Sequence, residues 1–180
     1  MIYKVFNKVH NFFYQNHIKS KVSFSGKHAK QSFIAETGAK IYNAHVEVGD
    51  GVKFYHNVII FGNGPVIIGD GSKIGYNTII YASKNGGVYI GKNCAIAANA
   101  YIIDTNHSTD RFVTSIQEMD HSQKIVIGDN VWISAQCVIG MGSKLGNNTI
   151  IGANSFVNKE FPENAVLAGS PATLIKYRGE

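Results

Sequence analysis

The stretch "IVIGDNVWISAQCVIGMGSKLGNNTIIGANSFV", residues 125–157, repeats its pattern of side chains every six residues. The same spacing runs through three earlier triplets of apolar residues, which short insertions separate. A return after six residues fits neither the period of a helix nor that of a plain strand. It predicts a coil of three short strands with a turn between each pair. The apolar positions are Val48, Phe54, Ile60, Ile68, Ile74, Ile80, Ile90, Ile96, Ile102, Ile127, Ile133, Ile139, Leu145, Ile151 and Val157.

Small residues keep fixed places within this repeat. The residue after the apolar one is often glycine, as at Gly49, Gly69, Gly75, Gly91, Gly128, Gly140, Gly146 and Gly152. The fourth residue after it is usually small, as at Val52, Ser72, Thr78, Cys94, Ala100, Val131, Cys137, Ser143, Thr149 and Ser155. We expect the apolar side chains to fill a narrow prism, the small ones to lie near its corners, and the glycines to adopt turn conformations that other residues would strain to reach. One such coil buries too little to stand alone, so many must stack.

Over residues 48–175 this pattern resembles the hexapeptide-repeat acyltransferase family. The resemblance implies an all-β fold, a left-handed parallel β-helix, assembled as a homotrimer. We expect the β-helix domain to span residues 22–168, with residues 22–47 as irregular first coils, and a basic C-terminal tail over residues 169–180.

Residues 1–21 differ in kind from the rest. Their first 16 residues place Ile2, Val5, Phe6, Val9, Phe12 and Phe13 at helical spacing. This spacing predicts a short amphipathic helix. Solenoids need a cap over their open apolar ends, so the helix is expected to cover the first coil. Docking on a membrane surface or on another protein is the alternative, because lysines and aromatic residues accompany the apolar ones.

Composition predicts one domain of 180 residues, with 44% hydrophobic and 16% charged residues. The net charge is +5, and the lysines and arginines are scattered and form no run, which argues against a nucleic-acid partner and suits a phosphorylated cofactor. Cys94 and Cys137 are too few for a disulfide framework and fall at inward-facing small positions. We expect a cytoplasmic protein without a secretory signal or a membrane-spanning helix.

The repeat is interrupted after Ile102, where the segment "IIDTNHSTDR", residues 102–111, opens a loop expected over residues 104–124. A long loop out of a tight solenoid is commonly functional. His107 at its base is suited to take a proton from an acceptor hydroxyl or amine near pH 7. Asp104, Asn106 or a backbone carbonyl would hold the other ring nitrogen. A loop histidine without a role is the alternative.

His107 also matches the catalytic histidine of the galactoside, maltose and nodulation-factor O-acetyltransferases in this family. The resemblance implies that it acts as general base on an acceptor hydroxyl that attacks acetyl-CoA directly. It places Asn77 and Asn85 at acceptor-contacting positions, and Arg111 in the same loop is a further candidate. Relatives often have Asp at position 85, and an ordinary turn residue in "KNGG" is the alternative for Asn85.

Trp132 falls on an outward position, where a lone tryptophan is costly unless something covers it. The cover is either structural, from the loop or another subunit, or the pantetheine arm of the cofactor, as the likeness of "GDNVWIS" to the family implies. Lysine and arginine in the basic tail are either solvated or paired with cofactor phosphates. The cofactor-binding positions implied by the resemblance, or suggested in the tail, are Ala97, Trp132, Ala135, Ala153, Asn158, Lys159, Lys176 and Arg178.

Together these features predict acetyl-CoA-dependent O-acetylation of a carbohydrate, in a cleft between adjacent subunits. Bacterial capsule, O-antigen or exopolysaccharide, including lipid-linked precursors, is the expected acceptor. Alternatives are acetylation of an antibiotic or of a nucleotide-sugar amine, a non-enzymatic scaffold or ice-binding solenoid, and a γ-type carbonic anhydrase. The last would need three histidines converging on zinc, and His107 has only His121 nearby in the sequence. We therefore expect no metal.

Overall fold

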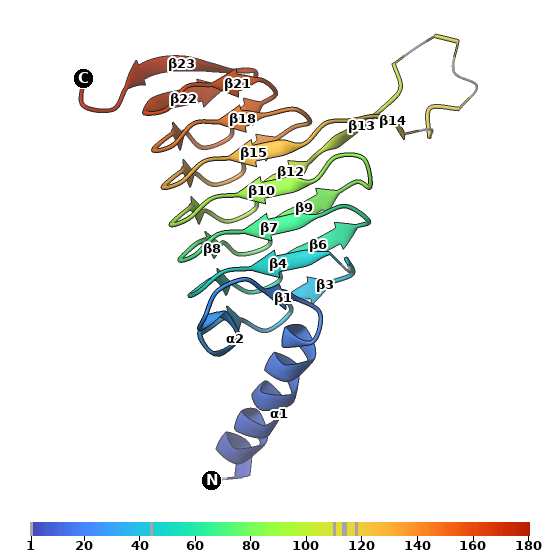
Figure 1. The fold of residues 1–180 in the computed structure, drawn as a ribbon, viewed down its shortest axis with the longest axis vertical. Coiled ribbons are helices and arrows are strands. Elements are labelled where there is room, and N and C mark those ends of the chain that lie inside the picture. Colours follow the sequence, from blue (N-terminus) through green and yellow to red (C-terminus); the bar gives the residue numbers. More distant parts are fainter. Residues whose placement is uncertain (1, 44, 110, 113–114, 118) are drawn as a thin grey trace.

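The computed structural model describes residues 2–43, 45–109, 111–112, 115–117 and 119–180, and it describes their side chains except for those of residues 2–9, 119 and 120. The described strands wind into a solenoid of three parallel sheets, which we call A, B and C (Figure 1). Sheet A contains β1 (Ser23–Phe24), β4 (Val46–Val48), β7 (Val66–Ile68), β10 (Val88–Ile90), β15 (Ile125–Ile127), β18 (Lys144–Leu145) and β21 (Glu160–Phe161). Sheet B contains β2 (Ile34–Ala35), β5 (Lys53–Phe54), β8 (Lys73–Ile74), β11 (Ala95–Ile96), β16 (Trp132–Ile133), β19 (Ile150–Ile151), β22 (Ala165–Gly169) and β23 (Ala172–Tyr177). Sheet C contains β3 (Lys40–Ile41), β6 (Ile59–Gly62), β9 (Ile79–Ala82), β12 (Tyr101–Ile103), β17 (Val138–Ile139) and β20 (Phe156–Val157).

The chain passes from sheet A to B to C in each coil and then returns to A, which gives an A–B, a B–C and a C–A corner. Equivalent residues of successive coils are paired in register. Ile90, for example, pairs with Ile68 on one side and with Ile127 on the other. Side chains along each strand therefore alternate between stacked apolar rows that face the interior and rows that face solvent. The three-residue strands of sheet A contribute two inward rows, as Val88 and Ile90 show.

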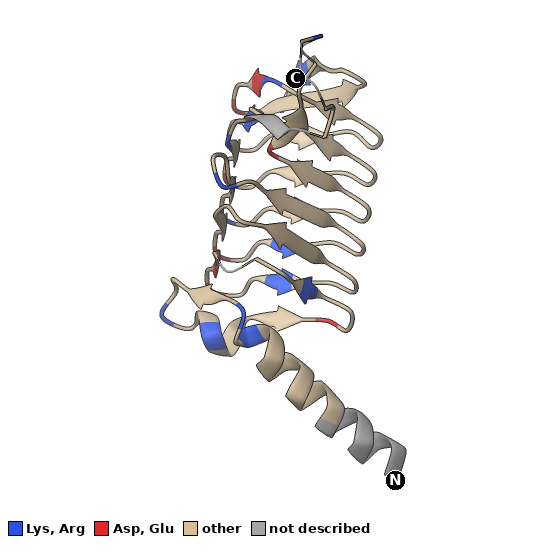
Figure 2. Ribbon diagram, turned by 90° about the vertical axis from the view of Figure 1, so that its right-hand side faces the viewer, with Lys and Arg blue, Asp and Glu red and all other residues tan. Residues whose placement is uncertain are grey.

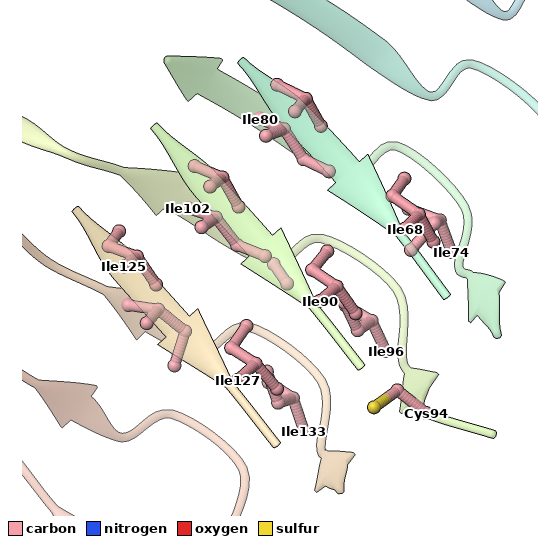
Figure 3. Packing of buried hydrophobic residues seen from close by; sticks show 14 of the residues in the cluster. Ile68, Ile74, Ile80, Ile90, Cys94, Ile96, Ile102, Ile125, Ile127 and Ile133 are labelled. Carbon is pink, nitrogen blue, oxygen red and sulfur yellow. The ribbon is translucent and has the colours of Figure 1, made fainter. Parts of the chain in front are cut away.

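The predicted apolar row forms the core. Each of its fifteen members is at most 3% exposed, and the small positions are buried with them. Figure 3 shows how Ile68, Ile90 and Ile127 of successive coils stack in this core. Buried hydroxyl groups at those small positions are satisfied across coils. Ser72 Oγ donates to the Gly91 carbonyl at 2.7 Å, and Thr78 Oγ1 donates to the Ala97 carbonyl at 3.2 Å. The interior accepts polar groups only because these bonds are made.

The reason predicted for the glycines is wrong. None of the eight glycines that follow an apolar position has a positive φ. The left-handed residue comes two positions later, for instance at Gly71 (φ 71°) and Asn93 (φ 54°). The glycines are needed because the next coil approaches them closely. A Cβ on Gly69 would lie 2.7 Å from the carbonyl carbon of Gly91, closer than any ordinary contact.

Helix α1 (Ile2–Lys19) is longer than predicted, and its C-terminal turns contact the solenoid. Ile18 is buried against the first coil, and the Tyr14 hydroxyl donates to the carbonyls of Glu36 and Ala39, each at 2.9 Å. Phe12 and Phe13, which were expected to cover the coil, are 63% and 66% exposed. The remainder of the helix projects beyond the coils (Figure 1). No helix in the described part of the chain is long and apolar enough to cross a membrane.

Most of the predicted basic tail forms a strand, β23. The chain turns back after Gly169 at the end of β22, and β23 pairs antiparallel with β22, so it closes the end of sheet B. Ala172 in this strand is buried. Lys176 Nζ donates to the Glu180 carbonyl at 2.9 Å, and Arg178 Nη1 donates to the Asn148 carbonyl at 3.0 Å. These contacts order the segment against the last coils.

Candidate functional site

The coil pattern breaks at the C–A corner after β12, where a hairpin leaves the solenoid. β13 (Thr105–His107) pairs antiparallel with β14 (Met119–Ser122), and the hairpin points away from the coils (Figure 1). The register shifts between Asn106 and His107, which leaves one extra residue on β14. Such a bulge re-aims neighbouring side chains and is common beside active sites. His107 is exposed at this bulge, and within the described residues no hydrogen bond engages its ring.

Asp104 does not hold the His107 ring, contrary to the prediction. Its side chain is fully buried and accepts hydrogen bonds from the residue 83–87 turn. The Ser83 backbone N–H lies 2.8 Å from Oδ1, the Ser83 hydroxyl lies 3.1 Å from Oδ2, and the Gly87 backbone N–H also donates to Oδ2. Hydrogen bonds to a carboxylate are in general stronger than hydrogen bonds between two neutral groups. Asp104 therefore fastens this turn to the base of the hairpin.

The fastened turn is the one that carries Asn85. A Cβ on Gly86 would lie 2.2 Å from Asp104 Oδ2, and Gly87 adopts φ 119°, so both positions require glycine. Asn85 is exposed at the tip of this turn. The structure thus brings Asn85 and the base of the His107 hairpin to the same corner. The linking contacts to Ser83 and Gly87 were not anticipated, because sequence spacing does not indicate which insertions meet.

Further bonds fix the base of the hairpin. Thr105 is buried, and its Oγ1 donates to the His121 carbonyl at 2.8 Å. Ser122 Oγ donates to Thr105 Oγ1 at 3.3 Å, and the Gln123 N–H donates to the Asp104 carbonyl at 3.0 Å. The start of β13, the strand that carries His107, is therefore bonded to the end of β14 and to the residue that follows it.

Asn106 and Arg111 are exposed beyond this base. The Arg111 guanidinium carbon lies 4.7 Å from the centre of the Phe112 ring, which is itself exposed. The predicted roles of Asn106 at the histidine and of Arg111 at the acceptor stay predictions.

Asn77 lies on a different corner, B–C, and has a structural task there. It adopts φ 56° and belongs to a ladder of amides. Asn57 Nδ2 donates to Asn77 Oδ1, and Asn77 Nδ2 donates to Asn99 Oδ1, each at 3.1 Å. Asparagine tolerates the left-handed conformation that this corner needs. The structure does not place Asn77 beside His107.

Trp132 lies beside a groove of about 300 Å³ on sheet B and the B–C corner. Its ring is 51% exposed, and Ala97, another predicted cofactor position, lines the same groove. Most of the other lining residues are small or aromatic, with Lys73 as the charged one. They are Tyr55, Lys73, Gly75, Tyr76, Ala95, Ile96 and Ala98. The groove suits an extended, mostly apolar ligand segment.

The alanines predicted to line the cofactor arm do not form one row. Ala135 and Ala153 come two residues after the inward Ile133 and Ile151, whereas Ala97 comes directly after Ile96. The equivalent of Ala135 and Ala153 is Ala98. Backbone bonds bear this out, since Gln136 N–H donates to the Ala98 carbonyl and Asn154 N–H to the Ala135 carbonyl, each at 3.0 Å. Counting from Ile96 would have found Ala98.

The other predicted cofactor residues lie elsewhere on the solenoid. Asn158 and Lys159 follow β20 and so occupy the C–A corner, where Lys159 Nζ lies 5.4 Å from the centre of the Phe161 ring. Lys176 lies on β23, and Arg178 bonds to Asn148 at the A–B corner. One chain therefore does not gather the whole predicted set.

The two halves of the predicted site lie at opposite edges of sheet C. His107 belongs to the C–A corner, and the groove beside Trp132 reaches the B–C corner. Between them the solvent side of sheet C carries a paired, mainly apolar row. This row consists of Ile59, Ile79, Tyr101, Val138 and Phe156.

Neither cysteine is placed for nucleophilic catalysis. Burial raises the pKa of the Cys94 thiol and of the Cys137 thiol, which keeps both protonated near neutral pH. Among the described residues no cluster of three or more His, Cys, Asp and Glu side chains is arranged to hold a metal ion.

Two stretches of the chain match families of hexapeptide-repeat proteins. Residues 124–159 match the bacterial transferase hexapeptide family (six repeats), and residues 65–103 match the hexapeptide repeat of succinyl-transferase. The predicted resemblance is therefore confirmed.

Curated relatives are similar over part of their length. The chain is 42% identical over 89 residues to the galactoside O-acetyltransferase of Escherichia coli (strain K12), covering 49% of this chain and 43% of that protein. It is 34% identical over 97 residues to the putative lipopolysaccharide biosynthesis O-acetyl transferase WbbJ of the same strain, covering 49% and 50%. The chain thus spans about half the length of these relatives.

Solved structures are similar over most of the chain. The Bacillus cereus N-acyltransferase AntD, in complex with dTDP and 3-hydroxybutyryl-CoA, aligns with a TM-score of 0.78 at 21% identity, covering 91% of this chain and 87% of that one. A maltose O-acetyltransferase from Clostridium difficile 630 aligns with a TM-score of 0.61 at 25% identity, covering 92% and 75%. The predicted fold, an all-β left-handed parallel β-helix, is confirmed.

Proposed function

We propose that this chain, in which residues 65–103 and 124–159 match hexapeptide-repeat families, is an acetyl-CoA-dependent O-acetyltransferase acting on a carbohydrate of a bacterial surface polysaccharide. The galactoside and lipopolysaccharide O-acetyltransferases among its relatives support this acceptor class. The observation that carries the proposal is the break in the coil at the C–A corner, where a braced hairpin presents His107 to solvent.

In the proposed reaction His107 acts as general base. A neutral ring nitrogen takes the proton of the acceptor hydroxyl while the hydroxyl oxygen attacks the thioester carbonyl carbon. A carbon–oxygen bond forms, the carbon–sulfur bond breaks, and the proton passes from His107 to the departing thiolate. The buried thiols of Cys94 and Cys137 have raised pKa values and take no part. Transfer is therefore direct.

The acyl donor is proposed to bind in the groove beside Trp132. Ala95, Ala97 and Ala98 leave room for a narrow chain, and the half-exposed Trp132 ring offers an apolar face that a ligand would cover. Lys159, Lys176 and Arg178 are the cations proposed for the cofactor phosphates.

We propose that the complete site forms between subunits of a homotrimer. One chain holds His107 and the Trp132 groove at opposite edges of sheet C. If a second subunit packs on the apolar row of sheet C, the His107 edge of one subunit can lie beside the Trp132 groove of its neighbour. Direct transfer needs both substrates side by side, which this arrangement provides.

The test is thiol release from acetyl-CoA with a panel of mono- and oligosaccharides, uronic and sialic acid polymers, and amino sugars. We expect turnover with a saccharide hydroxyl, and a loss of about 10²- to 10⁴-fold in kcat for His107→Ala. His45→Ala serves as the control, because His45 is an exposed histidine in the early coils. Equal rates for His107→Ala and wild type would refute the assignment of the base. Acetylation of amines alone would replace the O-acetyl proposal with an N-acetyl one.

A further inference from the structure

The basic residues form no continuous run, but the net positive charge of the chain lies in its first 35 residues. This segment holds six lysines and no aspartate or glutamate, and Glu36 is the first acidic residue. The lysines are Lys4, Lys8, Lys19, Lys21, Lys27 and Lys30. Residues 36–180 hold eleven basic and twelve acidic residues. The N-terminal end of the molecule therefore carries more positive charge than the whole chain.

This charge gathers at one end of the solenoid. Basic segments lie around α2 (Ala29–Ser32) and the foot of the coils, where α1 emerges (Figure 2). Lys21, Lys27 and Lys30 are exposed there. No ion pair engages these three lysines within the described residues. The basic end is thus available to an anionic partner.

The same end of the molecule exposes two aromatic side chains, Phe12 and Phe13, that do not pack against the coils. Tyr14 and Ile18 face the first coil, and at 100° per residue Phe12 and Phe13 fall on the opposite side of α1. Their rings lie 5.7 Å apart, edge to face, and each is nearly two-thirds exposed. Ile2, Val5, Phe6 and Val9 precede them in the sequence at helical spacing. Phe12 and Phe13, which we call the outward stripe, thus point away from the first coil.

We infer that α1 docks the protein on the surface of an anionic phospholipid bilayer. Phe12 and Phe13 would enter the boundary between headgroups and acyl chains, and the lysines would lie near the lipid phosphates. Because no described helix can cross a membrane, the contact is peripheral. A second copy of the chain is the competing occupant of this stripe. Charge favours the bilayer, because pairing two such ends would bring six lysines against six.

The inference is tested by sedimentation of the full-length protein with vesicles of phosphatidylcholine, with and without about 30% phosphatidylglycerol. We expect binding to the anionic vesicles to be roughly tenfold or more tighter than to neutral ones, and to weaken in 0.5 M salt, because screening removes the lysine contribution. Binding that ignores lipid charge, or no binding at all, would overturn it.

Paired variants separate the stripe from general surface effects. Phe12→Ser/Phe13→Ser is expected to lose roughly tenfold or more in vesicle affinity. Phe112→Ser, which changes an exposed phenylalanine on the distant hairpin, is expected to bind as wild type. Lys21→Gln/Lys27→Gln should weaken binding, whereas Lys84→Gln/Lys124→Gln should not.

Light scattering of the same proteins distinguishes a second copy of the chain from a bilayer as the partner of Phe12 and Phe13. If Phe12→Ser/Phe13→Ser lowers the mass of the assembly in solution and leaves vesicle binding unchanged, the stripe is a contact between copies and the inference fails. If the mass is unchanged and vesicle binding falls, the bilayer is the partner. The readout needs no acyl transfer, so it is independent of the proposed reaction.

Discussion

Asp104 shows how one side chain can support a site without touching the reacting atoms. It is fully buried directly after β12, three residues before His107, and its carboxylate accepts bonds from Ser83 and Gly87. The contact joins the turn that carries Asn85 to the strand that carries His107. The position of Asn85 relative to His107 therefore depends on the Asp104 carboxylate.

Asp104 Oδ2 accepts hydrogen bonds from the Ser83 N–H, the Ser83 hydroxyl and the Gly87 N–H. In Asp104→Asn an NH₂ group, which cannot accept these bonds, replaces one of the two carboxylate oxygens. We expect Asp104→Asn to lower the free energy of unfolding by about 2–3 kcal/mol, the worth of hydrogen bonds to a charged group. The KM for the saccharide should rise while the KM for acetyl-CoA stays near that of wild type, because the Trp132 groove lies on another face. Thermal unfolding and initial rates measure both. An unchanged melting temperature with unchanged KM values would show that the carboxylate does not brace the site.

At the scale of the coil, side chains at the A–B corner bond to the backbone of the preceding coil. Asp50 Oδ1 accepts from the His28 N–H at 2.8 Å, and Asp70 Oδ1 accepts from the Asp50 N–H at 2.9 Å. Asp129 and Asn147 continue the pattern further along the solenoid. Corner residues thus tie neighbouring coils together in addition to the strand ladders.

Asp70 makes this corner sensitive to acid. The Asp50 backbone N–H and then the Lys92 ammonium, 3.0 Å away, hold the pKa of Asp70 below its usual value. Its contribution to stability is present above the unfolded-state pKa of about 3.9 and is lost as the pH falls through the lower folded-state pKa. Asp70→Asn should therefore melt below wild type at pH 7, by a small margin because the group is solvent-exposed. We expect the difference to shrink toward pH 3, and equal differences at both pH values would contradict this.

The sequence predicts positions within one coil, but it does not predict the contacts between residues of successive coils. The fifteen apolar positions and the ten small positions of the repeat follow from spacing within one coil, and they were predicted. A second buried row in sheet A, at Val46, Val66, Val88 and Ile125, was not predicted. The role of Gly69, the bonds of Asp104 and the equivalence of Ala98 with Ala135 depend on which residues of successive coils meet. Insertions of different length decide those meetings, and a periodic pattern contains no information on them.

For the whole molecule, the apolar outer row of sheet C is the surface expected to carry the trimer. Val138 lies in this row, whereas Val126 lies on the solvent side of sheet A in the same coil. The same change at these two valines therefore separates the faces. We expect Val138→Glu to yield monomers and Val126→Glu to preserve the assembly, as measured by light scattering, because a charge buried at an interface is costly. Dissociation by Val126→Glu alone would move the interface to sheet A.

A site shared between subunits also predicts rescue between inactive chains. His107→Ala lacks the base, and Trp132→Asp lacks the proposed donor face, so each should be inactive as a homotrimer. In trimers refolded from an equal mixture, a site pairs an intact His107 from one chain with an intact Trp132 from its neighbour in about a quarter of random arrangements. We expect roughly a quarter of wild-type activity from the mixture, and no more than the parent variants if the two are mixed without refolding. Absence of rescue after confirmed subunit mixing would mean that His107 and Trp132 act within one chain or not together, because only a cleft built from two chains lets complementary defects cancel.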